Sequence, residues 1–320
     1  MNATPLISIV CPVFNEQACV PLFYDRLQEA LQPLRGRYEM ELIFTNNAST
    51  DNTLAEILKL RSGDPRIQVL TLSRNFGYQA SVSTGLRHAR GAAMVVIDVD
   101  CEDPPELIPA FVEGWEKGYD VVYGKRDRRP EFFALHLTRK AFYRVTRMIA
   151  DSDFVLDMAE FSLITASVRD AILSQRSTLP FLRSEIAYVG FRRKGISYGR
   201  GPRAAGKTNY NMTHITAFAI TGILSSSTFP LRLSFYAFPF LAVLNIALLG
   251  WGKFHALVTL DFLYIGFFFA VICIYLARIY KDVVGRPLSV VDWGRSAFGE
   301  RGGAVALETD RVPPPNSKTE

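Results

Sequence analysis

Two long apolar runs near the C-terminal end constrain the fold of this chain more than any other feature. Residues 233–251 and 256–277 are almost free of charge, and only residues 252–255 separate them. Each run matches the roughly 20 apolar residues that an α-helix needs to cross a bilayer core. A buried hairpin of a soluble protein rarely needs two helices that are apolar all round. The sequence therefore predicts a transmembrane hairpin, with the rest of the chain folded outside the membrane.

Basic residues flank this hairpin and predict its orientation. Arg232 precedes the first run, and Arg278, Lys281 and Arg286 follow the second. Because basic residues concentrate on the cytoplasmic side, we expect a multi-pass protein of the inner (plasma) membrane with a cytoplasmic N-terminal domain and cytoplasmic termini. The polar Asn245 within the first run needs a partner in lipid, and we therefore expect a homo-oligomer.

The N-terminal part of the chain alternates short apolar, β-branched runs with longer segments of helical periodicity. This alternation predicts an α/β fold, with a Rossmann-like, mostly parallel sheet and helices on both of its faces. Strands are predicted over residues 7–13, 38–45, 67–72, 93–97 and 120–123. Ligands of such sheets bind beyond the carboxyl ends of the strands. Polar segments follow four of these strands, so we expect them to converge on one site.

An acidic segment follows the fourth predicted strand. Asp98, Asp100 and Glu102 alternate along it, and side chains two residues apart in an extended segment point the same way. Carboxylate oxygens suit hard divalent cations such as Mg²⁺ and Mn²⁺. We therefore expect these three residues to hold one such cation together with a diphosphate leaving group.

Composition and charge narrow the range of partners. The chain of 320 residues has a formal net charge of +5, and its basic residues are scattered. This suits a membrane surface or a phosphorylated substrate, whereas a nucleic-acid partner is not indicated. The four cysteines form no C-x-x-C pair and the four histidines have no metal-ligand spacing, so neither zinc nor a disulfide framework is expected.

Residues 201–208 match the phosphate-loop pattern G-x-x-x-x-G-K-[ST] letter for letter. Such a loop in a nucleotide hydrolase needs a strand before it and a parallel sheet after it. Here the predicted sheet lies upstream and a membrane span follows, so we disfavour a nucleotide hydrolase. Arg203 and Lys207 of this segment are nevertheless expected to contact phosphate.

The segments between the sheet and the hairpin have amphipathic patterns. Aromatic and basic residues alternate over residues 131–150, which is typical of an interfacial helix, although an ordinary surface helix fits the pattern equally well. We divide the chain into a cytosolic domain at 1–210, a juxtamembrane amphipathic helix at 211–232, two transmembrane helices within 233–280, and a cytosolic, largely disordered tail at 281–320.

Seven motifs in a fixed order carry a family resemblance over nearly the whole chain. They are residues 8–16, 48–53, 72–77, 98–106, 121–126, 226–232 and 278–287. Together they resemble glycosyltransferase family 2, and specifically the polyisoprenyl-phosphate glycosyltransferases similar to dolichol-phosphate mannose synthase. The resemblance implies a GT-A type domain and an inverting hexosyltransferase. It also implies transfer of a single sugar from a nucleotide-diphosphate sugar to a polyprenyl phosphate such as undecaprenyl phosphate.

The resemblance also implies roles for individual residues. Contacts with the nucleotide-sugar are expected from Pro12, Phe14, Glu16, Asn46, Arg74, Asp98, Val99 and Asp100. Phosphates of donor or acceptor are expected to bind Arg126, Arg128, Arg203 and Lys207. Asp157 is the candidate base or acceptor-orienting residue, with a helix cap as the alternative, and Asp100 is the second catalytic candidate.

Some positions depart from the family pattern. Asn46 and Asn47 stand where paired aspartates are usual, Glu102 replaces a glutamine, and Glu160 and Ser162 replace an aspartate and an arginine. An asparagine can both donate and accept, so the preference for the base is open, with UDP as the first candidate.

Two alternative functions stay open beside this one, and a third is disfavoured. A family 2 transferase acting on another acceptor, a glycan or a lipid, would share the fold. A processive synthase would normally carry a Q-x-x-R-W motif, which the chain lacks. A catalytically inactive, nucleotide-sugar-binding membrane protein is suggested by Asn46, Asn47 and Ser162.

Overall fold

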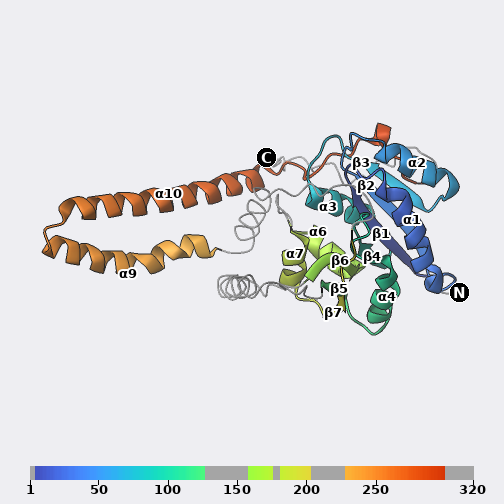
Figure 1. Cartoon of the computed structure of the whole chain (residues 1–320), viewed down its shortest axis with the longest axis horizontal. Coiled ribbons are helices and arrows are strands. Elements are labelled where there is room, and N and C mark those ends of the chain that lie inside the picture. Colours follow the sequence, from blue (N-terminus) through green and yellow to red (C-terminus); the bar gives the residue numbers. More distant parts are fainter. Residues whose placement is uncertain (1–3, 127–157, 176–180, 203–227, 300–320) are drawn as a thin grey trace, which may run out of the picture.

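The computed structural model describes residues 4–126, 158–175, 181–202 and 228–299. In these residues Figure 1 shows an α/β domain and two long helices that project from it side by side. The start of the first strand lies on the side of the domain opposite this hairpin. The expected interfacial helix at 131–150 and residues 211–227 of the expected juxtamembrane helix at 211–232 lie outside the described residues.

Seven strands of the described residues form one mixed sheet in the order β3-β2-β1-β4-β6-β5-β7. Their bounds are β1 Leu6–Val13, β2 Glu39–Asn46, β3 Ile67–Thr71, β4 Ala93–Val96, β5 Val121–Arg126, β6 Met158–Thr165 and β7 Arg193–Tyr198. Strand β6 runs antiparallel to β4 and β5, while every other neighbouring pair is parallel. The predicted, mostly parallel sheet is therefore confirmed, and its parallel strands all end at the edge where β6 begins.

The five predicted strands correspond to β1 to β5 within a few residues, whereas β6 and β7 were not predicted. Strand β6 carries the polar Glu160 and Ser162 on one face, which interrupts the apolar run typical of a buried strand. Strand β7 lies at the edge of the sheet, and most of its residues are partly exposed. Both strands thus lack the continuous hydrophobic signal that marks the central parallel strands.

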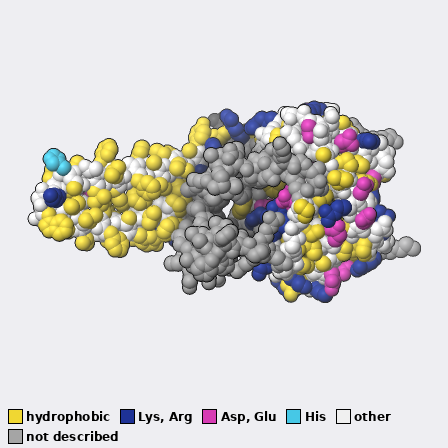
Figure 2. All heavy atoms as spheres, in the orientation of Figure 1, with side chains coloured by type: hydrophobic (Ala, Val, Ile, Leu, Met, Phe, Trp, Pro, Cys, Tyr) yellow, Lys and Arg dark blue, Asp and Glu magenta, His cyan; other side chains and the backbone are white. Residues whose placement is uncertain are grey.

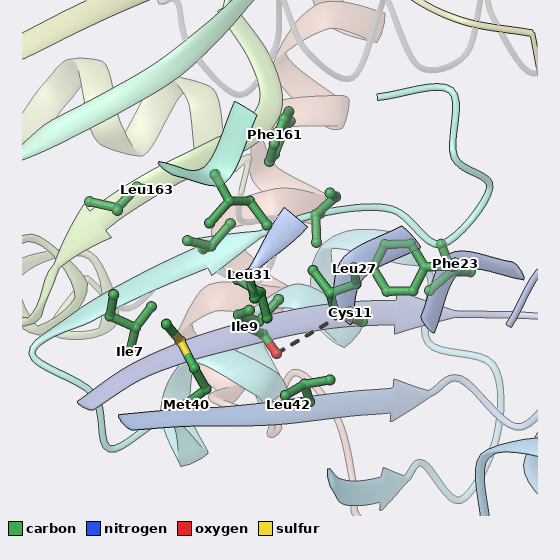
Figure 3. Close-up of a cluster of buried hydrophobic side chains, with 14 of the residues drawn as sticks. Ile7, Ile9, Cys11, Phe23, Leu27, Leu31, Met40, Leu42, Phe161 and Leu163 are labelled. Atoms are coloured by element: carbon green, nitrogen blue, oxygen red, sulfur yellow. Dashed lines mark hydrogen bonds between the residues drawn. The ribbon is translucent and has the colours of Figure 1, made fainter. Parts of the chain in front are cut away.

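Helices cover both faces of the sheet, as predicted. Their bounds are α1 Cys19–Ala30, η1 Gln32–Leu34, α2 Thr53–Gly63, α3 Tyr78–His88, η2 Pro105–Leu107, α4 Ile108–Glu116, α6 Ala166–Leu173 and α7 Leu182–Val189. Side chains of α1, α2 and α4 pack on one face, and those of α3, α6 and α7 on the other. Figure 3 shows the first face, where Ile7, Ile9 and Cys11 of β1 belong to one hydrophobic cluster with Phe23 and Leu27 of α1. Val10, which lies between Ile9 and Cys11 in the sequence, packs on the second face, as the two-residue period of a strand requires.

Two helices, α9 (Phe229–Gly250) and α10 (Phe254–Val284), are long and apolar enough to cross a membrane. Their large apolar side chains are exposed, and Figure 2 shows an almost entirely hydrophobic surface on this hairpin. Both helices extend beyond the predicted runs, 233–251 and 256–277, because helical hydrogen bonding continues through polar residues such as Arg278. The Asn245 side-chain amide donates to the Asp261 carboxylate at 2.6 Å, so its donor already has a partner within the hairpin.

After α10 the chain returns to the sheet. Residues 289–299, which we call the strap, lie along the outer edge of β3 and form antiparallel bridges between Leu72 and Val291 and between Val69 and Ala297. The strap contains η3 (Trp293–Arg295). These residues thus depart from the expectation of a largely disordered tail over 281–320, whereas residues 300–320 lie outside the described part of the chain.

A charged cluster lies between α3, β6 and α7 on the second face. Glu160 of β6 pairs with Arg183 of α7 at 2.9 Å and accepts a hydrogen bond from Gln79 of α3 at 3.4 Å. Burial raises the pKa of Glu185, also on α7, to about 7, and the negative charge of Glu160 adds to the shift against a backbone hydrogen bond from Phe181. In the folded protein the Glu185 carboxyl therefore stays protonated up to pH values well above the ordinary pKa of a carboxyl group.

Replacing Glu185 with glutamine should stabilise the protein in a pH-dependent way. Because the folded-state pKa of Glu185, about 7, lies above its ordinary 4.5, ionisation costs folded-state stability as pH rises through this interval. The variant Glu185→Gln should gain up to about 3 kcal/mol at pH 8 and nothing at pH 4.5. Thermal unfolding of the detergent-solubilised protein between pH 4.5 and pH 8 measures this difference. An equal gain at every pH would contradict it.

Candidate functional site

The loops that follow β1 and β2 are joined by hydrogen bonds at the carboxyl edge of the sheet. Asn15 adopts a left-handed conformation with a φ of 55°, which asparagine tolerates better than most residues. Its backbone N–H donates to Ser49 Oγ at 3.0 Å, and its side-chain oxygen accepts from the Thr50 backbone at 2.8 Å. The backbone N–H of Glu16 donates to Thr53 Oγ1 at 2.8 Å. This bracing leaves Phe14 exposed at the edge.

The two asparagines at the end of β2 are buried and use their amides internally. Asn46 accepts a hydrogen bond from the Ser49 backbone at 3.1 Å and donates to Thr71 Oγ1 at 3.5 Å. Asn47 donates to the side chain of Asn75 at 3.0 Å and accepts from the Phe76 backbone at 2.9 Å. Both residues therefore organise the loops after β2 and β3.

The residues predicted to contact the nucleotide-sugar differ in how far they are buried. Pro12, Asn46 and Val99 are buried in the structure, so they shape the site from within. The residues with accessible surface are Phe14, Glu16, Arg74, Asp98 and Asp100. The Arg74 guanidinium lies 4.0 Å from the centre of the Phe76 ring, a cation–π contact that orients it beside the end of β3.

Asp98 follows β4 and is hydrogen-bonded to a helix on the second face of the sheet. Its carboxylate accepts a hydrogen bond from the Tyr78 hydroxyl at 2.8 Å. Burial raises the pKa of Asp98 to about 7, the Tyr78 hydrogen bond opposes this shift, and the charges of Asp100, Asp103 and Glu160 reinforce it. The Asp98 carboxyl is thus partly protonated near neutral pH.

The structure does not gather Asp98, Asp100 and Glu102 into the expected metal site. In the described residues, no group of three histidine, cysteine, aspartate or glutamate side chains is placed to hold a metal ion. Cys101 has a φ of 60°, so the segment turns and the assumed extended alternation is broken. The carboxylates of Asp98 and Glu102 also have different partners, the Tyr78 hydroxyl and the Arg200 guanidinium. The three carboxylates are therefore not grouped in the described residues, and a three-carboxylate metal site stays a prediction.

A buried carboxylate organises the other half of the edge. Asp103 is fully buried and accepts hydrogen bonds from the Tyr198 hydroxyl and, at 3.1 Å, from Arg126 Nη2. Arg200 Nε lies 3.6 Å from the same carboxylate. Burial opposes the charge of Arg126, but Asp103 and Tyr198 raise the pKa of its guanidinium overall. These contacts fix the loop after β4 to the ends of β5 and β7.

Sequence reasoning missed three of these residues as parts of a site. Tyr78 and Tyr198 belong to no motif, and their roles follow only from the packing of α3 and β7 beside the loop after β4. Arg200 directly precedes the glycine-rich segment at 201–208, which is the one signal that could have drawn attention to it.

Four predicted residues, Asp157, Arg128, Arg203 and Lys207, lie outside the described residues. Strand β6 begins at Met158, next to Asp157 in the chain, and pairs there with Lys125 of β5. The described part of the edge combines the carboxylates of Asp98, Asp100 and Asp103 with the guanidinium groups of Arg126 and Arg200. Such an edge can bind both an anionic ligand and a cation that accompanies it.

Comparisons with known proteins identify relatives of this chain. The model of glycosyl transferase family 2 matches residues 8–157. The uncharacterized glycosyltransferase YkcC of Bacillus subtilis (strain 168) is 34% identical over 304 residues, which cover 89% of this chain and 92% of that protein. An SfII prophage-derived bactoprenol glucosyl transferase of Shigella flexneri is 33% identical over 301 residues, or 89% of this chain and 97% of that protein.

Among solved structures, the mannosyltransferase PcManGT from Pyrobaculum calidifontis matches with a TM-score of 0.45 and 18% sequence identity, covering 90% of this chain and 86% of that chain. The sequence relatives are much closer, and each spans most of this chain. Together with the family model, they show that this chain is a glycosyltransferase that belongs to glycosyl transferase family 2.

Proposed function

We propose that this enzyme transfers a single hexose from a nucleotide-diphosphate sugar, with a UDP-sugar as the first candidate, to a polyprenyl phosphate such as undecaprenyl phosphate. Transfer inverts the anomeric carbon. The bactoprenol glucosyl transferase of Shigella flexneri, whose name specifies a polyprenyl acceptor, matches this chain over most of both proteins and supports the acceptor class.

One observation of the structure carries the proposal for a lipid acceptor. Helix α10 ends at Val284, and the strap contacts the domain from Ser289 onward, where the Ser289 hydroxyl lies 2.6 Å from Thr84 Oγ1 of α3. The Ser73 backbone N–H then donates to Val290 at 2.9 Å, directly after β3. Residues 285–288 link the two, so the Cα atoms of Val284 and Ser289 lie at most about 18 Å apart. A spanning α10 therefore holds the carboxyl edge of the sheet near the membrane surface, where a lipid phosphate resides.

The residues of this edge suit the chemistry of sugar transfer. Asp100, with Asp98, would hold one Mg²⁺ or Mn²⁺, since such ions often combine one or two carboxylates with substrate phosphates. The cation would neutralise charge on the departing diphosphate. Arg126 and Arg200 offer guanidinium groups that bind phosphate oxygens in pairs.

Roles on the acceptor side are assigned to residues outside the described part of the chain. Asp157 would orient the acceptor phosphate or take its proton, and little base strength is needed because the second pKa of a phosphate monoester is about 6. Arg128, Arg203 and Lys207 would bind phosphates of the donor or acceptor.

A transfer assay with the detergent-purified full chain tests this function. Label from UDP-, GDP- or CDP-sugars should pass to undecaprenyl phosphate and give one lipid-linked monosaccharide when Mg²⁺ or Mn²⁺ is present. Chelation should abolish product formation, because departure of the diphosphate is unfavourable when no cation neutralises its charge. Donor binding without transfer from any donor would point to another acceptor or to a binding-only protein.

The two nearby carboxylates Asp100 and Glu102 should differ in metal dependence. The Glu102 carboxylate is paired with Arg200, so Glu102→Gln should change the metal concentration for half-maximal activity by less than about 2-fold. Loss of a direct ligand in Asp100→Asn should raise it by about 10-fold or more. Metal titration of the transfer reaction measures both values. Equal shifts of this metal concentration in the two variants would indicate that Glu102 is a metal ligand as well.

We also propose that α9 and α10 anchor the enzyme in the inner membrane with the catalytic domain and both termini in the cytoplasm. A cysteine at Lys253, in the turn between the helices, should then react with a membrane-impermeant maleimide on intact cells. A cysteine at the exposed Lys59 of α2 should react only after lysis. Both variants would lack the exposed Cys273. Labelling of Lys59→Cys in intact cells would reverse the topology.

A further inference from the structure

The strap begins a continuous series of hydrogen bonds across the carboxyl edge of the sheet. The Thr71 hydroxyl, at the end of β3, donates to the backbone oxygen of Arg295 at 2.8 Å. The Asn46 amide donates to the same Thr71 oxygen at 3.5 Å and accepts from the Ser49 backbone at 3.1 Å. Ser49 Oγ in turn accepts from the Asn15 backbone at 3.0 Å. The series joins the strap to the loops after β2 and β1.

The chemistry of Thr71 gives this series a direction. A threonine hydroxyl has one hydrogen and two lone pairs, and the strap uses the hydrogen. The oxygen therefore accepts from the amide nitrogen of Asn46, which places the amide oxygen toward the Ser49 backbone. The Ser49 backbone N–H and the Thr71 oxygen thus select the same orientation of the fully buried Asn46 amide, and the strap contributes to it through Thr71.

We propose that the strap is a positioning element for the donor nucleotide. Acting through Thr71 and Asn46, it sets the loop after β2 and, through Ser49, the loop after β1 that carries Phe14 and Glu16 at the edge of the sheet. Because residues 285–288 connect the strap directly to α10, the same contacts link the donor side of the site to the membrane hairpin. This inference rests on the proposed function for the identity of the ligand as a nucleotide-diphosphate sugar.

A simpler role for the strap is to cover the exposed edge of β3, as edge strands commonly require. That role would involve all of its contacts alike, including the one at the opposite end of β3, where the Gly299 backbone donates to the Gln68 side chain at 2.8 Å. The positioning role requires the contact at Thr71 specifically. Gln68 thus offers a matched control on the same strand and the same strap.

Calorimetric binding of UDP and of GDP to the detergent-solubilised full chain, with Mg²⁺, tests the proposal. Thr71→Val should weaken UDP binding by about 3- to 10-fold, the range expected for one hydrogen bond. Thr71→Ser keeps the hydroxyl and should bind UDP as tightly as the unchanged chain does. Gln68→Ala should bind UDP with an affinity within about 2-fold of the unchanged chain. Where transfer is measurable, the donor KM should rise with little change in kcat.

A double-mutant cycle separates positioning from a general loss of stability. Asn46→Asp keeps an acceptor for the Ser49 backbone but cannot donate to Thr71 when ionised. Combined with Thr71→Val, it should weaken UDP binding no further than the more severe single variant, because both remove the same link. Additive losses, or equal losses in Gln68→Ala and Thr71→Val, would overturn the positioning role.

The outcomes also separate this inference from the proposed function. UDP binding that depends on Thr71 without any transfer to undecaprenyl phosphate would support the strap's role and remove the proposed acceptor. Unchanged UDP binding in Thr71→Val would remove the strap's role alone. A wild-type chain that binds neither nucleotide would overturn the proposed donor and the strap's role with it.

Discussion

The buried carboxylate of Asp103 is the interaction on which the shape of the candidate site most depends. It lies in the loop after β4 and is held by Tyr198 of β7 and Arg126 of β5, two strands that reach the sheet on the far side of the antiparallel β6. Removing one partner of a buried charge commonly costs several kcal/mol, because the remaining charge is left unpaired. The acidic loop therefore takes its course from strands distant in sequence, and its carboxylates are placed accordingly.

The central parallel strands could be predicted from the sequence, since strands buried on both faces are continuous apolar runs bounded by polar loops. The insertion of β6 between β4 and β5 could not. Glu160 and Ser162 interrupt its apolar pattern, and the burial of the Glu160 carboxylate is compensated by Arg183 and Gln79 from other elements. Such compensation arises only in the folded chain, so local patterning misses the strand.

The candidate site was predictable in position but only partly in detail. Strand ends correctly located the polar loops, because parallel strands bring their carboxyl ends to one edge. The three carboxylates expected to hold a metal ion are not grouped in the described residues, because the left-handed Cys101 breaks the alternation from which the cluster was predicted. Asn46 was expected to face the nucleotide, yet its amide is used internally, by Ser49 and Thr71. A sequence motif identifies a residue type at a position but does not specify which neighbours its polar atoms satisfy.

The strap links the α/β domain to the apolar hairpin, two parts that were predicted from separate features of the sequence. Its bridges to Val69 and Leu72 satisfy an edge strand that would otherwise present unpaired backbone groups. Its aromatic residues Trp293 and Phe298 pack edge-on against His88 of α3, with ring centres 5.8 and 5.5 Å apart. Helix α3 also carries Tyr78, the partner of Asp98. The chain leaving the apolar hairpin thus contacts both β3 and α3, so any displacement of α10 relative to the domain acts on the elements that hold Asn46 and Asp98.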